Sequence, residues 1–179
     1  RSNLEIEWFH FEYIERSYRK FKESKMLMDF TDLLELLVQD PERLPTLQAL
    51  IIDEAQDLSK LQWTLVMQLA ERAQRTWIAG DDDQAVYIWA GADVESFLSC
   101  EGESRVLNQS YRVPSKIHSF ADKIVRRIKR RQPKEWAPRT EGGEINYYND
   151  FQQVDISSGE WLVMASTNYM LNDMHDWIK

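Results

Sequence analysis

The sequence predicts an α/β protein built around a parallel β-sheet with flanking helices. Two short apolar runs, residues 47–52 and 76–79, have the pattern of buried strands, and a helical pattern lies between them. A strand, a helix and a second strand in this order are typical of a parallel sheet joined by right-handed crossovers. Each run leads into acidic residues, and ligands of such sheets bind at the carboxyl edge.

Composition limits the class of protein. The 179 residues are 43% hydrophobic and include seven tryptophans, which indicates a packed core in one or two domains. The formal net charge of −8 excludes a generally basic nucleic-acid binder, so any nucleic-acid contact must be local. Cys100 is the only cysteine, which excludes an internal disulfide or a Cys-based zinc site and fits a reducing, cytoplasmic location. No apolar run has transmembrane length and no signal peptide is visible, so we expect no membrane partner.

Periodicity predicts two helices at the start of the chain. Apolar residues recur at helical spacing through the first 25 residues, which predicts an amphipathic helix, and we expect its aromatic cluster at residues 8–13 in the core. Asp32 followed by Glu35 has the form of a capping box that opens a second helix, and Pro41 follows its end.

The middle of the chain contains two further helix starts. Ser59 and Gln62 form another capping-box pair, which begins the helix between the two strands. Asp93 is expected to cap a short helix through residues 97–98, and residues 105–107 form a third strand candidate.

The last third of the chain is predicted to return to helix and strand. A long helix is expected after Pro114, continuing to Ile128. Residues 145–148 and 161–165 have a strand-like pattern, and a closing helix begins at about Tyr169.

The first apolar run ends in two carboxylates. Residues 50–57 read LIIDEAQD, so Asp53 and Glu54 come directly after the strand. Adjacent acids at a sheet edge suit magnesium–nucleotide chemistry, with one near the ion and the other orienting or deprotonating an attacking water. The alternative is a strand that stops at an acidic turn.

The second strand leads into a loop rich in acids and aromatic rings. Gln84 can hydrogen-bond a phosphate oxygen or a water without carrying charge. Tyr87 and Trp89 would point to the same side of an extended segment, where they could stack on unpaired bases, although core packing is the alternative. Asp82 and Asp83 are interpreted as solvated loop acids rather than as part of a metal site.

Two basic features follow. A change of subdomain is predicted at residues 111–114, and Arg112 lies there in the sequence LNQSYRVP. Arg112 could reach a γ-phosphate when a cleft between subdomains closes. The alternative is a surface or salt-bridge arginine. Seven Lys and Arg residues between positions 123 and 134 could contact phosphates. We favour the alternative, a solvated helix face that balances acids elsewhere.

The order of these segments resembles the UvrD/Rep-like superfamily 1 DNA helicases. The matching segments are IIDEAQD (residues 51–57) for the Walker B motif, AGDDDQ through YIWAGAD (residues 79–93) for motif III, and QSYR (residues 109–112) for the Asn-Tyr-Arg core of motif IV. DFTDLL (residues 29–34) resembles the segment before Walker B, and Trp136, residues 143–144 and residues 161–168 are more loosely similar to the start of the second RecA-like domain.

This resemblance implies a fold and an activity. The fold would be a RecA-like parallel sheet flanked by helices, of the P-loop NTPase type, and incomplete. Residues 1–112 would be the C-terminal part of the first RecA-like (ATPase) domain, and residues 113–179 the N-terminal part of the second. The activity would be that of an ATP-dependent DNA helicase or translocase that uses ATP and Mg²⁺ and moves on single-stranded DNA or DNA junctions, 3′ to 5′ by analogy, with a monomer favoured.

The resemblance also implies site residues and their roles. They are Asp53 for Mg²⁺, Glu54 for activating the hydrolytic water, Gln84 for sensing the γ-phosphate, Arg112 as the finger of the second domain, Tyr111 beside the adenine, and Tyr87 and Trp89 for single-stranded DNA.

The sequence departs from the family pattern at several points. Ser110 stands where the family usually has Asn, and Ala90 where many members have Arg. No Gly-x-x-x-x-Gly-Lys-Ser/Thr loop is present, so we expect the isolated chain to bind nucleotide weakly at best and to unwind no DNA. Two alternatives stay open: a non-catalytic, helicase-like binding module, and, ranked last, a nuclease that uses Asp53, Glu54 and residues 81–83 as a two-metal site.

Overall fold

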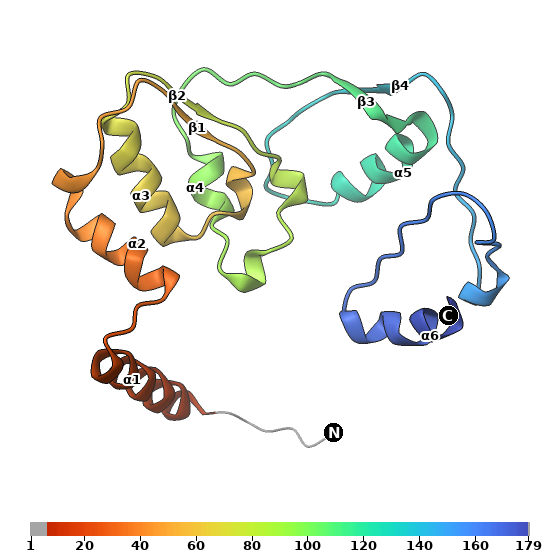
Figure 1. Ribbon diagram of the computed structural model, residues 1–179. Coiled ribbons are helices and arrows are strands. Elements are labelled where there is room, and N and C mark those ends of the chain that lie inside the picture. Colours follow the sequence, from red (N-terminus) through yellow and green to blue (C-terminus); the bar gives the residue numbers. More distant parts are fainter. Residues whose placement is uncertain (1–6, 179) are drawn as a thin grey trace. The chain divides into compact units, whose positions relative to one another are not determined.

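The computed structural model describes residues 7–178, which form two compact units (Figure 1). The first unit comprises the chain up to Arg105 together with Ile128–Lys134, and the second comprises Val106–Arg127 and Glu135–Lys179. The basic segment Ile128–Lys134 is therefore part of the first unit, although Val106–Arg127 of the second unit separates it from the rest of that unit in the sequence.

The first unit begins with two helices, α1 (Trp8–Lys25) and α2 (Phe30–Gln39). The predicted helix is confirmed for residues 8–25, while residues 1–6 of the prediction lie outside the described residues. The expectation that its aromatic residues lie in the core is wrong, since Trp8 is 75% exposed and Phe11 52%. The capping box of α2 was predicted one turn too late. Asp29 caps the helix, and its carboxylate accepts a hydrogen bond from the backbone N–H of Asp32 at 3.0 Å while Asp32 reciprocates at 2.9 Å.

A parallel pair of strands joined by a helix forms the centre of the first unit. Strands β1 (Leu50–Ile52) and β2 (Thr76–Ile78) pair in parallel, and α3 (Lys60–Glu71) connects them, as predicted. The Ser59–Gln62 capping box of α3 is present in both directions. Figure 1 shows α3 running alongside the two strands.

The core of this unit lies between the sheet and α3. Trp63 and Val66 of α3 are buried together with Ala55, and Phe97 packs against this cluster. The strand β1 is shorter than predicted, and Ile51 is 72% exposed. The prediction of a buried strand holds only in part, because Leu50 is buried and Ile52 half-buried whereas Ile51 between them is exposed.

The remaining helix of the first unit is α4 (Val94–Leu98), which begins as predicted at Asp93, whose side chain accepts from the backbone N–H of Ser96. Residues 105–107 form no strand in the structure.

The second unit contains a smaller parallel pair, β3 (Gln109–Pro114) and β4 (Ala137–Arg139). Helix α5 (Ser115–Val125) begins immediately after Pro114 and ends before Ile128, earlier than predicted. Residues 145–148 and 161–165 are not strands; β3 pairs with the Pro-containing β4, which the apolar pattern did not indicate. The predicted closing helix is present as α6 (Asn172–Ile178).

Short 3₁₀ helices link these elements. They are η1 (Pro41–Arg43), η2 (Ala55–Asp57), η3 (Asp82–Gln84), η4 (Ile88–Ala90), η5 (Phe151–Gln153) and η6 (Asn168–Leu171). Across residues 7–178, no helix combines the length and the apolar character needed to cross a bilayer.

Candidate functional site

The two strands of the first unit deliver their following loops to one edge of the sheet. The parallel ladder continues past both strands: Ala79 donates its backbone N–H to the carbonyl of Ile52 at 2.8 Å, and Ala55 donates to the carbonyl of Ala79 at 3.0 Å. The acidic turn after β1 and the loop after β2 therefore lie next to each other, as expected for loops at the carboxyl edge of a parallel pair.

Asp53 and Glu54 form the turn after β1. Both side chains are exposed, and the Asp53 carboxylate accepts the backbone N–H of Glu54 at 2.9 Å. Glu54 has φ +52° and ψ +39°, the left-handed conformation that residues with a Cβ seldom adopt. Strained backbone of this kind clusters at active sites and ligand clamps.

Gln56 joins the two loops, a role that the motif analysis missed. Its side chain is 1% exposed. Its Nε2 donates to Glu54 Oε2 at 2.8 Å, and its Oε1 accepts the backbone N–H of Asp81 at 2.9 Å. The sequence held one signal for this role, because Gln56 is an uncharged amide among acids directly after a strand. A buried amide needs both a donor and an acceptor as partners, so it can join two loops.

Gln84 lies at the end of η3, on the same network. Its Nε2 donates to Asp81 Oδ2 at 2.6 Å, and its backbone N–H donates to the carbonyl of Asp81 at 2.9 Å. A continuous chain of hydrogen bonds thus runs from Glu54 through Gln56 and Asp81 to Gln84. The structure brings together three of the residues singled out from the sequence, Asp53, Glu54 and Gln84.

The acids of η3 are paired with the basic segment Ile128–Lys134. Lys134 Nζ contacts Oδ1 of Asp81 and of Asp82, each at 2.5 Å, and Arg131 forms a two-pronged ion pair with Asp83. The interpretation of Asp82 and Asp83 as solvated loop acids is wrong, since Asp82 is 7% exposed and the Asp83 side chain 9%.

The same contacts overturn the interpretation of a solvated helix face for Arg131 and Lys134, whereas Lys123, in the last turn of α5, is exposed. The helix α5 ends at Val125, and the side chains of Lys134 and Arg131 are only 13% and 21% exposed. The expectation that the run balances acids elsewhere is confirmed for these two residues and for Arg130, which pairs with Glu95.

Burial and pairing act in opposite directions on the ionisation of this cluster. Burial by itself raises the pKa of Asp81, but the hydrogen bond from Gln84 and the ammonium of Lys134 outweigh it, so the pKa lies below the usual value. Burial likewise disfavours the charged form of Lys134, but its hydrogen bonds to Asp81 and Asp82 prevail, and its pKa is raised. Both groups are therefore held in their charged forms.

The aromatic pair of this loop is exposed, but not as the sequence predicted. Tyr87 and Trp89 are 51% and 84% exposed, so the alternative of core packing is wrong. The segment is not extended, because Ile88–Ala90 form the 3₁₀ helix η4. At about 120° per residue, side chains two positions apart on such a helix point in different directions.

Tyr111 and Arg112 lie on β3 of the second unit. Both side chains are exposed, Tyr111 at 86%, and within residues 7–178 Arg112 forms no ion pair. Ser110, the departure from the family pattern, accepts the backbone N–H of Val113 on its hydroxyl at 3.1 Å.

The carboxylate oxygens at the sheet edge of the first unit suit a magnesium ion that keeps most of its water ligands. In the described part of the chain, no three His, Cys, Asp or Glu side chains gather as a ready-made metal cage. Asp53 offers a single exposed carboxylate, which fits Mg²⁺, an ion that binds through one or two carboxylates and keeps several of its waters.

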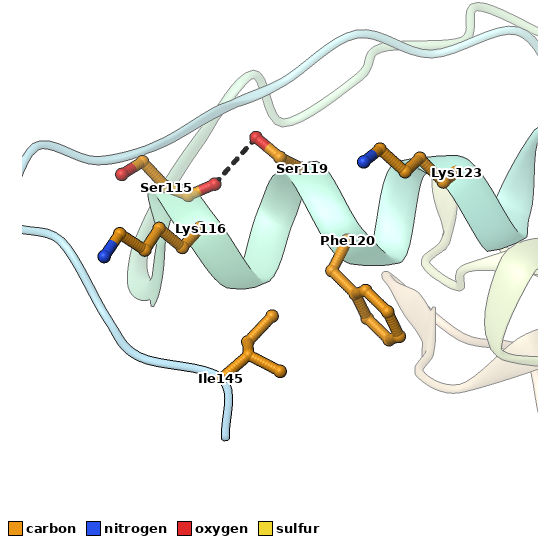
Figure 2. A pocket seen from close by; sticks show the side chains of 6 residues that line it. All are labelled: Ser115, Lys116, Ser119, Phe120, Lys123 and Ile145. Atoms are coloured by element: carbon orange, nitrogen blue, oxygen red, sulfur yellow. Dashed lines mark hydrogen bonds between the residues drawn. The ribbon is translucent and has the colours of Figure 1, made fainter. Parts of the chain in front are cut away.

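A separate pocket of about 290 Å³ lies along α5 in the second unit (Figure 2). Lys116, Phe120 and Lys123 line it with Ile145, and Ser119 donates to the carbonyl of Ser115 at 3.0 Å. None of the residues predicted to bind ATP, Mg²⁺ or single-stranded DNA lines this pocket, although Lys123 belongs to the basic run.

The fold and the edge network define an α/β protein with acids and amides at the carboxyl edge of a parallel strand pair. The chain belongs to the UvrD/Rep-like helicase family: the family described as the UvrD/REP helicase N-terminal domain matches residues 5–105.

Three bacterial relatives are similar along most of the chain. The ATP-dependent DNA helicase PcrA of Bacillus subtilis (strain 168) is 32% identical over 167 residues, which cover 84% of this chain and 23% of that protein. PcrA of Staphylococcus aureus (strain Mu50) is 33% identical over 142 residues, covering 72% and 20%. PcrA of Staphylococcus epidermidis is 30% identical over 164 residues, covering 82% and 22%. The chain therefore spans between 20% and 23% of the length of these relatives.

Proposed function

We propose that this chain is part of an ATP-dependent DNA helicase or translocase, in which ATP hydrolysis drives movement along single-stranded DNA, 3′ to 5′. The observation that carries the proposal is the hydrogen-bonded chain from Glu54 to Gln84 at the carboxyl edge of β1 and β2. In this proposal residues 1–112 are the C-terminal part of a RecA-like ATPase domain, and residues 113–179 begin a second.

Glu54 and Gln84 are the proposed hydrolytic pair. Glu54 accepts a proton from the attacking water, and the hydrogen bond from Gln56 orients its carboxylate for that task. Gln84 contacts the γ-phosphate or the water with its amide, and its link to Asp81 limits how that amide can turn. The two residues are linked through Gln56 and Asp81, so a shift in one is transmitted to the other.

Asp53 is the proposed magnesium residue, acting on the ion through water. The bound ion would supply neutralisation of charge on the phosphate oxygens. The exposed carboxylate and its hydrogen bond to the Glu54 backbone keep the acid fixed beside the general base.

Two residues beside the proposed domain boundary, Tyr111 and Arg112, are proposed to supply further groups. Arg112 would provide the positive charge that stabilises the γ-phosphate in the transition state, and Tyr111 would contact the adenine. Their exposure, and the absence of an ion pair at Arg112 within residues 7–178, support this assignment. An Arg112→Ala variant that hydrolyses ATP at the wild-type rate would remove the role.

Tyr87 and Trp89 are the proposed DNA contacts. They follow Gln84 on one continuous loop, so the residue that senses phosphate and the residues that touch bases belong to the same short segment. Tyr87 precedes η4 and Trp89 lies in it, and their different directions favour contacts with two separate bases over a single shared stacking surface.

A phosphate-binding loop of the Gly-x-x-x-x-Gly-Lys-Ser/Thr type is not among the 179 residues. The residues present supply the γ-phosphate side of a nucleotide site and not the cradle for the other phosphates. We therefore expect the isolated chain to bind ATP weakly at best and not to unwind DNA, and we assign the activity to a protein that carries both parts.

The nuclease alternative is weakened by the pairing of the aspartates. Lys134 and Arg131 already contact the three carboxylates of residues 81–83, so a two-metal site there would have to displace both cations. The binding-module alternative predicts that the complete protein does not hydrolyse ATP, so an ATPase assay distinguishes it from the proposed helicase.

The decisive experiment replaces Glu54 in the complete protein. A Glu54→Gln change keeps the shape and a hydrogen-bonding amide but removes the proton acceptor, so we expect kcat to fall by at least about 10²-fold while ATP binding persists. A matched control is Glu101→Gln, an exposed acid of the same unit, which should hydrolyse ATP normally. Unchanged turnover in Glu54→Gln would remove the water-activating role, and an inactive wild-type protein would favour a non-catalytic binding module.

A further inference from the structure

The side chain of Lys134 supplies positive charge to the acidic turn after β2. It follows Asp81 by 53 positions in the sequence, yet its ammonium contacts Asp81 and Asp82 at 2.5 Å and lies 3.2 Å from Asp83 Oδ2. One half-buried ammonium thus contacts three carboxylates, which repel one another at short range.

The segment that carries Lys134 is held by contacts of its own. Arg131 donates to both oxygens of Asp83, at 2.7 and 2.6 Å. The backbone N–H of Gln132 donates to Asp82 Oδ2 at 2.8 Å, and its side chain donates to Ser104 Oγ at 2.7 Å. Removing the Lys134 ammonium would therefore change the charge at the turn without releasing the segment.

Asp81 divides its two carboxylate oxygens between different partners. Oδ1 accepts from Lys134 and from the backbone N–H of Asp83, whereas Oδ2 accepts from Gln84 Nε2 at 2.6 Å. Because the ammonium fixes the first oxygen, the second is held in place to receive the Gln84 amide. Asp81 also donates its backbone N–H to Gln56, which contacts Glu54.

We propose that Lys134 is a positioning residue for Gln84: its ammonium fixes the Asp81 carboxylate, and that carboxylate orients the Gln84 amide toward the γ-phosphate. The inference rests on the proposed function of Gln84 in ATP hydrolysis. Without the ammonium, the repulsion among the three carboxylates turns Asp81 away, and Gln84 loses the partner that sets its direction.

The test compares Lys134→Met with Lys134→Arg in the complete protein. Methionine keeps the length and removes the charge, so we expect kcat for ATP to fall on the order of 10²-fold, as misplaced catalytic groups do, while KM for ATP changes little. Arginine retains the charge and should recover part of the loss. The control is Lys129→Met, an exposed residue of the same segment, which should behave as the wild type.

A double-mutant cycle separates positioning from general stabilisation. If Lys134 acts through Gln84, adding Gln84→Ala to Lys134→Met causes no further loss of kcat, whereas independent effects would multiply. Hydrogen exchange of the Gln84 backbone amide, which donates to the carbonyl of Asp81, should be faster in Lys134→Met than in Lys129→Met.

Two results would overturn the inference: a Lys134→Met protein with the kcat of Lys129→Met, or losses from Lys134→Met and Gln84→Ala that multiply. A different result bears on the proposed function instead. If the wild-type protein does not hydrolyse ATP, or if Glu54→Gln hydrolyses it at the wild-type rate, the proposed function fails. The rate of amide exchange at Gln84 then still decides whether Lys134 orders the turn.

Discussion

The buried amide of Gln56 lies against Gly80 and leaves little room for a side chain at that position. Gly80 immediately precedes Asp81, and a Cβ placed on it would lie 2.7 Å from Gln56 Oε1 and 3.0 Å from the ring of Phe97. Real Cβ atoms do not approach an oxygen so closely, so this position requires the absence of a side chain. Gln56 is 1% exposed and hydrogen-bonded at both ends of its amide, so a displacement would break one of these bonds.

A Gly80→Ala change should therefore destabilise the first unit. Overpacking of this kind costs about 1–3 kcal/mol, because Gln56 or Phe97 must leave its preferred position. The free energy of unfolding in urea measures the loss. Gly142→Ala is the matched control, since a Cβ at Gly142 meets nothing within 4 Å. Equal stability of the two variants would show that Gln56 is not held as tightly as its burial indicates.

At the scale of elements, the junction of α1 and α2 depends on an ionic contact. Lys22 Nζ, at the C-terminal end of α1, donates to Asp29 Oδ2 at 2.9 Å and to Asp32 Oδ1 at 2.6 Å. The hydroxyl of Tyr18 also donates to Asp29 at 3.2 Å. The backbone N–H of Asp32 and the Lys22 ammonium together lower the pKa of Asp29 to about 2.

This pKa gives the junction a defined response to acid. A depressed carboxyl pKa contributes stability that is present above the unfolded-state pKa of about 4 and is lost as the pH falls towards about 2. Asn caps helices about as well as Asp, so Asp29→Asn removes the charge and retains the cap. We expect the variant to be less stable than the wild type at pH 7, and the difference to shrink as the pH falls from about 4 towards about 2, as measured by urea unfolding followed by circular dichroism.

The control for this experiment is Glu35→Gln, which removes an exposed charge from the same helix. If the stability difference between Asp29→Asn and the wild type did not shrink in acid, the ionic contact with Lys22 would not be its source.

Elements whose signals are local were predictable from the sequence. The helices α3 and α4 begin at capping residues that act on the next few positions, and the β1–α3–β2 order follows from adjacent apolar patterns. The start of α2 was misplaced because Asp32 belongs to two overlapping capping-box patterns. The contact of Lys22 with Asp29 and Asp32 favours the earlier one, and it connects different helices.

Features that depend on distant residues were not predictable. The strand β4 exists because it pairs with β3, whereas the apolar runs at residues 145–148 and 161–165 have no pairing partner in the structure. In the same way, the motif loops identified Asp53, Glu54 and Gln84, but not Lys134, which contacts Asp81 from 53 positions further along the chain. Ion pairs over such a separation have no sequence periodicity to indicate them.

For the molecule as a whole, the distribution of charge limits how DNA could be bound. The net charge is −8, and Arg130, Arg131 and Lys134 of the basic run are paired with acids. These residues are therefore not available as a general phosphate-binding surface. The exposed rings beside the hydrolytic loop offer a different kind of contact, because stacking on bases requires no net positive charge.

Trp89→Ala in the complete protein should then separate DNA binding from hydrolysis. Loss of one stacked base weakens binding of single-stranded DNA by about 1–3 kcal/mol, so DNA-stimulated ATP hydrolysis should fall at subsaturating DNA while basal hydrolysis stays unchanged. Trp8→Ala is the matched control, since Trp8 is exposed to a similar degree, 75% against 84%, on a helix distant in sequence from the motif loops. An equal loss of basal and stimulated hydrolysis in Trp89→Ala would mean that the ring supports the fold of the loop. A selective loss of the stimulated rate would place the DNA contact on the segment that also carries Gln84, and would make the short path from η3 to η4 the connection between nucleotide and DNA.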